Sequence, residues 1–150
     1  MERPELEALT FGKLFVLHQH LSRAADAFFE PLGVTGKQWL LLALLTRGVD
    51  RPPTLSEAAA LYGTSRQNIK QIATQLEKRG FVEVRADDED RRALRLHLTD
   101  RVSVFEEPQA ASTQAEMLHT VFEPLDTNDL SDLHQMIETL ASAQATGAPR

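Results

Sequence analysis

The residues from 65 to 78 carry a dense set of side chains that could hydrogen-bond another molecule. They are Ser65, Arg66, Gln67, Asn68, Lys70, Gln71, Thr74 and Lys78, with Glu77 as the single acid of this stretch. Glutamine amides match the edge of adenine and arginine matches the edge of guanine, whereas serine and lysine suit phosphate oxygens. These residue types favour recognition of nucleic acid, although an ordinary amphipathic helix with a polar outer face remains the alternative.

A second group of charges lies about twenty residues further on. Arg91 and Arg92 follow Asp90 in a turn that also contains Asp87, Asp88 and Glu89. Arginines at an exposed tip can enter the minor groove of DNA, where narrow stretches concentrate negative potential. Because the preceding acids would repel phosphate, we expect at least one of them to be paired within the protein. We also expect Asp90 to pair with one arginine and so orient the other. The alternative is a solvated, charged turn.

Other chemistry finds little support in the residues. The five histidines show no His-x₃-His spacing and the chain has no cysteine, so we expect no metal site and no disulfide. The serines that could act as nucleophiles, such as Ser56 and Ser65, fall where helix caps belong, and the carboxylates are scattered. We therefore expect neither an enzyme nor a cofactor.

The charge distribution separates one segment from the rest of the chain. The protein has 150 residues, a length that fits one domain, and a net charge of −6. Residues 64–95 contain eight basic and six acidic side chains, a net of +2, so the other residues carry −8. A locally basic element on an acidic body is typical of a protein that reads DNA with one face, and a solvated surface of mixed charge is the alternative. We expect no membrane span and no export signal, and thus a cytoplasmic protein.

The spacing of apolar residues predicts the elements that hold these groups in place. Helices are expected over residues 6–31, 35–46, 54–62 and 64–79, then up to 122 with a kink or late start at Pro108, and again from 126 or 127. Alternating apolar residues at 82–84 and 94–98 predict a β-hairpin around the charged turn. Residues 145–150 are expected to fray. The fold class is mainly α with a small β-hairpin wing, an α+β winged helix-turn-helix.

The two central helices have recognisable boundaries. Gly63 suits the turn between them, and Thr64 is expected to cap the second helix with Gln67 at the third position. Thr35 and Gln38 form the same pattern at an earlier helix start. The residues expected to face the core are Leu55, Ala58, Ala59 and Leu61 in the first helix, and Ile69, Ile72, Ala73 and Leu76 in the second.

Several short motifs, in their order and spacing, closely resemble the MarR family of bacterial regulators. They are Gly33-Val34-Thr35-x-x-Gln38-Trp39, Thr64 to Ile69, Leu76 to Val82, Asp90-Arg91-Arg92, and Leu96-x-Leu98-Thr99. The resemblance implies a single domain over 1–150, with a winged helix-turn-helix part at about 35–99 and dimerisation helices at about 5–31 and 102–145. It also implies a homodimer that binds a pseudo-palindromic double-stranded DNA operator, with repression relieved by a small ligand.

The resemblance also assigns roles to single residues. Arg92 matches the wing arginine that enters the minor groove, and Ser65 to Asn68, Lys70 and Gln71 match the segment that reads the major groove. The family often has arginine where this chain has Gln71, which favours adenine at that contact. Candidate residues for an effector pocket, with an aromatic or phenolic acid as ligand, are Phe15, His18, Arg23 and Trp39.

The main alternative is a winged-helix module that binds another protein. Its acidic body could dock a basic partner without specific DNA binding. The polar, acid-poor outer face of residues 64–79 favours DNA instead.

Overall fold

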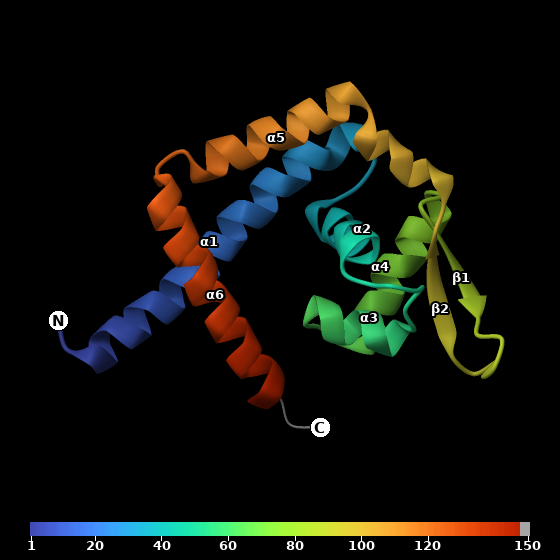
Figure 1. The fold of residues 1–150 in the computed structure, drawn as a ribbon, viewed down its shortest axis with the longest axis horizontal. Coiled ribbons are helices and arrows are strands. Elements are labelled where there is room, and N and C mark those ends of the chain that lie inside the picture. Colours follow the sequence, from blue (N-terminus) through green and yellow to red (C-terminus); the bar gives the residue numbers. More distant parts are fainter. Residues whose placement is uncertain (148–150) are drawn as a thin grey trace. The chain divides into compact units, whose positions relative to one another are not determined.

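The structure is a computed structural model that describes residues 1–147, and it confirms a mainly helical fold with one antiparallel hairpin (Figure 1). The chain forms two compact units, residues 1–106 and the residues from 107 onward. The first unit contains α1 (Arg3–Phe29), a 3₁₀ turn (Glu30–Leu32), α2 (Gly36–Arg47), α3 (Leu55–Tyr62), α4 (Arg66–Lys78), β1 (Val82–Ala86), β2 (Leu94–Leu98) and a 3₁₀ helix (Asp100–Glu106). The second contains α5 (Pro108–Phe122) and α6 (Thr127–Gly147).

The core of the first unit lies where α2, α3, α4 and the hairpin meet (Figure 1). Its buried side chains include Leu41, Leu55, Ile69, Leu76, Phe81 and Leu96. In α4 the buried residues are Ile69, Ile72, Ala73 and Leu76, as the spacing predicted. Because these four residues occupy one face of α4, the opposite face of this helix is left for solvent or a ligand.

Capping boxes fix the starts of α2 and α3. In each, a threonine side chain accepts from the third residue's backbone N–H, and that residue's side chain accepts from the threonine's N–H. The pairs are Thr35 with Gln38 and Thr54 with Glu57. Each box satisfies two N–H groups that a helix start would otherwise leave without a partner.

The start of α4 differs from the sequence prediction by one residue. Ser65, not Thr64, caps α4 and accepts from the backbone N–H of Asn68 at 3.1 Å. The reason is the preceding turn: Gly63 takes a left-handed φ of 78°, and Thr64 N–H still donates to the Ala59 carbonyl at the end of α3. Leu61, expected in the core, is 41% exposed.

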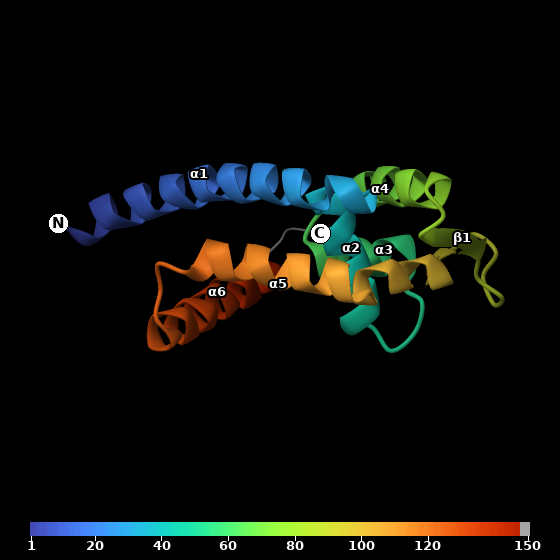
Figure 2. The ribbon, with the colours of Figure 1, turned by 90° about the horizontal axis from the view of Figure 1, so that it is seen from above.

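α1 is a long helix that extends well past the helices of the winged part (Figure 2). Its C-terminal end packs on the start of α2, where the rings of Phe29 and Trp39 stack with centroids 4.7 Å apart. Gly36 permits this approach, because a Cβ there would lie 2.7 Å from Ala25 Cβ. The rest of α1 exposes apolar side chains, which could form an interface with another molecule.

The hairpin pairs Val82 with Leu98 and Ala86 with Leu94 in antiparallel register. Its second strand also touches the start of α3 through a bridge between Thr54 and Arg95. The Leu96 N–H donates to the Pro53 carbonyl at 2.9 Å. The wing is thus anchored to the helix-turn-helix by backbone as well as side-chain contacts.

The second unit follows the predicted pattern around Pro108. A 3₁₀ helix ends at Glu106 and α5 begins at Pro108, which is the late start that the proline predicted. At the start of α6, Asp126 accepts from the N–H groups of Asn128 and Asp129 at 2.8 and 2.9 Å. α6 continues to Gly147, and the rest of the stretch expected to fray lies outside the described residues. No helix within residues 1–147 combines the length and apolarity needed to cross a bilayer.

Candidate nucleic-acid interface

The outer face of α4 forms an open hollow of about 850 Å³ lined only by polar and basic side chains. These are Arg66, Gln67, Lys70, Gln71, Thr74, Gln75 and Lys78, and all are exposed. Six of the seven were singled out from the sequence, and the fold places them on one surface. Such a surface offers hydrogen-bond donors and positive charge along the length of a helix, as a helix entering the major groove requires.

Glu77, the only acid of α4, is turned toward the wing. Its Oε1 accepts from the backbone N–H of Val84 at 2.8 Å, near the start of the hairpin. This contact directs the carboxylate at a strand N–H and keeps it out of the hollow, whose lining contains no acid. The negative charge that could repel a phosphate therefore lies outside the hollow.

The N-terminal end of α4 uses two of the predicted DNA-reading residues in its own structure. Ser65 is the N-cap, and the Asn68 side-chain amide donates to Thr64 Oγ1 at 2.9 Å. Asn68 is half-buried, whereas Arg66 and Gln67 are exposed. Ser65 and Asn68 thus have structural roles at the start of α4, whereas the side chains of Arg66 and Gln67 are exposed there.

Gln75 is the residue of this face that the sequence analysis missed. It lies four residues after Gln71 and three before Lys78, so helical spacing alone places it on the same face. Its side chain accepts from the amide of Gln38, a residue of α2, at 2.8 Å. The spacing could have identified Gln75 as part of the surface, but nothing in the sequence pointed to its partner 37 positions away.

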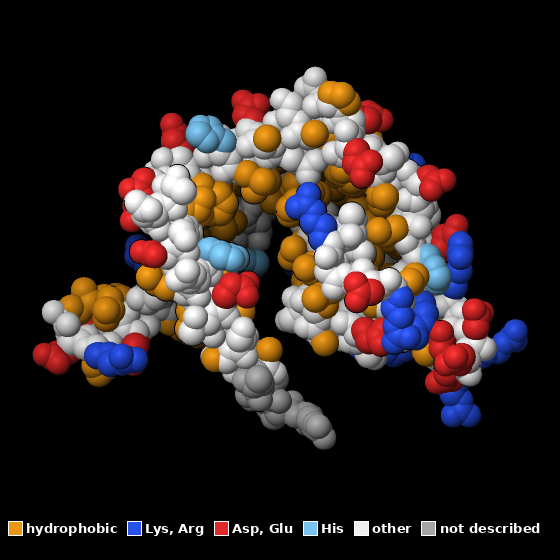
Figure 3. Space-filling model, viewed as in Figure 1, with side chains coloured by type: hydrophobic (Ala, Val, Ile, Leu, Met, Phe, Trp, Pro, Cys, Tyr) orange, Lys and Arg blue, Asp and Glu red, His pale blue; other side chains and the backbone are white. Residues whose placement is uncertain are grey.

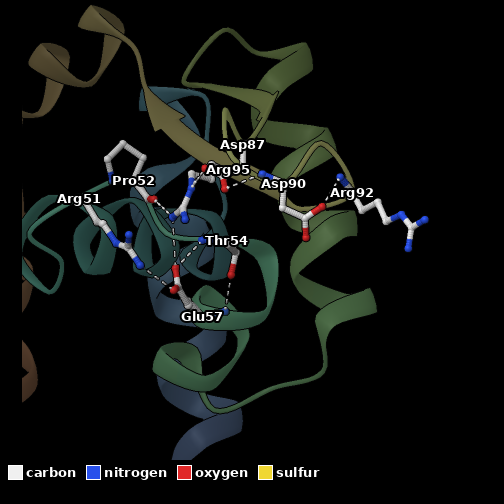
Figure 4. Close-up of polar contacts among 8 residues, drawn as sticks. All are labelled: Arg51, Pro52, Thr54, Glu57, Asp87, Asp90, Arg92 and Arg95. Carbon is white, nitrogen blue, oxygen red and sulfur yellow. Dashed lines mark hydrogen bonds and ion pairs between the residues drawn. The ribbon is translucent and has the colours of Figure 1, made fainter.

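The contacts of Asp90 and Arg92 in the wing differ from the expectation. Asp90 accepts from the backbone N–H of Arg92 at 3.0 Å, so it shapes the turn but forms no side-chain ion pair among the described contacts. The Arg92 side chain points away from the other residues drawn in Figure 4. The expected pairing of Asp90 with an arginine side chain is therefore wrong, because the turn brings only the backbone of Arg92 within reach.

Arg95 makes the internal ion pair in place of Arg91 or Arg92 (Figure 4). Its Nε donates to Asp87 at 2.6 Å, and its NH1 donates to the Pro52 carbonyl at 2.8 Å and lies 3.5 Å from Glu57. The expectation that one acid of the turn is paired internally is confirmed for Asp87. The network joins the wing to the loop before α3 and to α3 itself.

The ionisation of these groups follows from their contacts. The hydrogen bond from Arg95 lowers the pKa of Asp87, and the same pair raises the pKa of Arg95. The backbone N–H of Thr54, followed by the charges of Arg51 and Arg95, lowers the pKa of Glu57. The network is therefore fully charged at neutral pH.

A smaller hollow of about 250 Å³ brings the start of α4 and the wing together. Its lining includes Arg66 from α4, Ser56 from α3, and Asp90 and Arg92 from the wing. Figure 3 shows basic and acidic side chains side by side over this end of the first unit. The basic residues predicted to contact DNA from two separate elements thus border a single surface.

The proposed effector residues lie on α1 and at the start of α2. Phe15, His18 and Arg23 are exposed along α1, while Trp39 is half-buried against Phe29. Arg23 shares a contact of 3.2 Å with His20. No group of three or more potential metal ligands occurs among the described residues.

Comparisons with known proteins agree with this geometry. A sequence model of the MarR family matches residues 32–93. The chain is 35% identical over 105 residues to the transcriptional repressor MprA of Escherichia coli K12, a stretch covering 69% of this chain and 59% of MprA. The chain thus spans less than two thirds of the length of the curated relatives it matches.

Solved structures share the fold over most of their length. A probable transcriptional regulator from Pseudomonas aeruginosa is 26% identical, with a TM-score of 0.67 over 84% of this chain and 94% of that chain. Sco3205 of Streptomyces coelicolor, a MarR family regulator solved in complex with DNA, is 20% identical, with a TM-score of 0.79 over 96% and 93%. These relatives are named as regulators and not as enzymes, which agrees with the sequence prediction. In its motifs, in its fold and in the sequence of residues 32–93, the chain is similar to the MarR family.

Proposed function

We propose that this protein is a transcription regulator that binds double-stranded DNA, reading the major groove with α4 and the minor groove with the wing. The observation that carries the proposal is the outer face of α4, which is polar, basic and free of acid because Glu77 is bonded to Val84. The extended Arg92 side chain beside it supports a second contact. Such a protein would act in the cytoplasm, on the DNA.

The proposal divides the contacts into two classes. Arg66, Gln67 and Gln71 suit base edges because they are exposed and can form paired hydrogen bonds. Lys70, Thr74 and Lys78 suit the flanking phosphates, and Arg91 and Arg92 suit the minor groove. The relative MprA, a repressor, supports regulation by repression, and Sco3205, solved with DNA, supports DNA binding.

We propose further that the regulator acts as a homodimer on a pseudo-palindromic operator. α1 exposes large apolar side chains over most of its length, including Leu6, Leu9, Leu14, Phe15 and Leu17, each at least 44% exposed. Figure 3 shows such side chains at the surface of its N-terminal end. An exposed apolar surface of this extent is typical of a protein interface, and a second copy would cover it.

A small aromatic or phenolic acid is the proposed effector. Phe15, His18, Arg23 and Trp39 combine aromatic surface with groups that can hold a carboxylate. Since three of them are exposed on α1, such a pocket requires the second copy to close it. A panel of aromatic acids tested by thermal shift checks this part, and the absence of any shift would contradict it.

The experiment for the DNA-binding proposal is fluorescence anisotropy with DNA from upstream of the protein's own gene, beside a scrambled duplex, over a series of salt concentrations. We expect tighter binding to the native sequence, weakened by salt because each phosphate contact releases counterions. Weak binding that is equal on both duplexes would contradict the proposal and favour the protein-interaction module.

A further inference from the structure

Gln38 is the one polar residue of the first unit that is buried, with 3% of its surface exposed. It lies near the start of α2, and its amide contacts both Thr35, the cap of its own helix, and Gln75 on the outer face of α4. A buried amide must satisfy both its carbonyl oxygen and its NH2 group to avoid a large desolvation cost. Gln38 does so with partners on two different helices.

The orientation of the Gln38 amide is set by a donor that cannot reverse its role. The backbone N–H of Thr35 donates to Gln38 Oε1 at 3.1 Å, and a backbone N–H can only donate. The oxygen of Gln38 therefore faces Thr35, and its Nε2 points toward α4. There Nε2 donates to Gln75 Oε1 at 2.8 Å.

The same reasoning fixes the amide of Gln75. Because Gln38 presents only N–H groups to it, Gln75 must turn its own oxygen inward. Its NH2 group is the opposite branch of the same planar amide, so it is directed away from Gln38. Gln75 is exposed and lines the hollow on the face of α4 together with Gln71 and Lys78.

We infer that Gln75 is a further DNA-contact residue, held by Gln38 so that its side-chain NH2 donates to an acceptor atom of the DNA. That acceptor is either a phosphate oxygen or a base edge such as N7 or O6 of guanine. A freely rotating glutamine could donate or accept, whereas this one presents donors only. The inference rests on the proposed DNA-binding function, and makes Gln38 a positioning residue inside the protein.

The first test is Q75E, measured by anisotropy on the native and scrambled duplexes. A carboxylate still accepts from Gln38, so the contact between α2 and α4 and the melting temperature are expected to persist. Toward the DNA it presents an acceptor and a negative charge, and we expect operator binding to weaken by at least about tenfold. T46E, on an exposed residue near the end of α2, adds a negative charge outside the hollow and outside the proposed dimerisation helices, and is the control.

The second test changes no residue that faces the DNA. In Q38M, a side chain of similar length fills the buried position but offers Gln75 no hydrogen bond. The amide of Gln75 is then no longer held with its oxygen inward, and it can present either its oxygen or its NH2 group to the DNA. We expect operator binding to weaken by about threefold or more in protein that melting curves show to be folded.

The outcomes separate this inference from the function on which it rests. A loss in Q75E larger than in T46E supports the contact. An equal loss on both duplexes identifies a phosphate oxygen, and a larger loss on the operator identifies a base edge. A loss no greater than that of T46E overturns the inference, while a wild type that binds its operator retains the proposed function. A wild type that binds no DNA overturns both.

Discussion

Two arginines of the wing, three positions apart, have opposite surroundings. Arg95 is held between Asp87, the Pro52 carbonyl and Glu57, with 16% of its side chain exposed. The Arg92 side chain points away from this network. Because Arg95 anchors the hairpin, Arg92 can be presented to a ligand from a fixed base, at the cost of only its own side-chain entropy.

The first prediction at this scale concerns Arg92. We expect R92A to weaken operator binding by roughly 1–3 kcal/mol, because the wing loses its contact with the minor groove. Anisotropy on the native duplex measures the change. R85A, in the same hairpin but paired with Glu83, is the control. A loss below about 0.3 kcal/mol in R92A would show that the wing takes no part in binding.

The Asp87–Arg95 pair predicts how wing stability depends on pH. The folded pKa of Asp87 lies below its usual 3.8, so the pair stabilises the fold above that value and loses its effect as pH falls through the folded pKa. We expect D87N to be less stable than the wild type at neutral pH and to converge with it in acid. Urea unfolding at several pH values measures this.

The control for this prediction is D88N, which removes the neighbouring charge of the same turn. Its stability relative to the wild type is expected to change less between neutral and acid pH. A constant difference between D87N and the wild type across this range would contradict the assigned role of the pair.

At the scale of elements, patterns within a few neighbouring residues predicted the helix starts and the hairpin. The helix starts at Thr35 and Thr54 follow from capping boxes contained within four residues, and the hairpin follows from alternation on both strands. The start of α4 was misplaced by one residue because Thr64 still belongs to the turn after Gly63. Both Thr64 and Ser65 are good caps, and only the chain path decided between them.

Some contacts of the site could not be predicted from the sequence. Asp87 meets Arg95 through the cross-strand register, and Gln38 meets Gln75 through the packing of α2 on α4. The pairing expected for Asp90 failed for the same reason, since neighbours along the chain are not neighbours in the turn. The polar face of α4 was predictable because helical spacing alone defines it.

The cap of α4 provides the prediction for an element. We expect S65A to lower the free energy of unfolding by about 1 kcal/mol, because the N–H of Asn68 loses its acceptor. Chemical denaturation measures this, and S56A, an exposed serine at the start of α3, is the control. Equal stability of S65A and S56A would contradict the assigned cap.

At the scale of the whole molecule, the proposed assembly depends on α1. Single exposed apolar residues are common on protein surfaces, but α1 exposes many leucines and phenylalanines along one helix. A lone chain would leave these side chains in water. Two-fold symmetry would place two copies of α4 on one duplex, and the operator would then consist of two half-sites. Affinity for the full site would exceed that for one half-site through effective concentration alone.

The last prediction breaks this assembly without touching the DNA-binding face. We expect L17E to shift the protein toward the monomer, because a charge replaces an apolar side chain that a second copy would cover. T46E, on an exposed residue near the end of α2, adds the same charge outside α1 and should remain dimeric. Light scattering after size exclusion measures the mass of each variant. In anisotropy, L17E should lose most of its preference for a full operator over a half-site while its half-site affinity stays near that of the wild type. A monomeric wild type, or a dimeric L17E with full operator affinity, would show that α1 does not carry the interface.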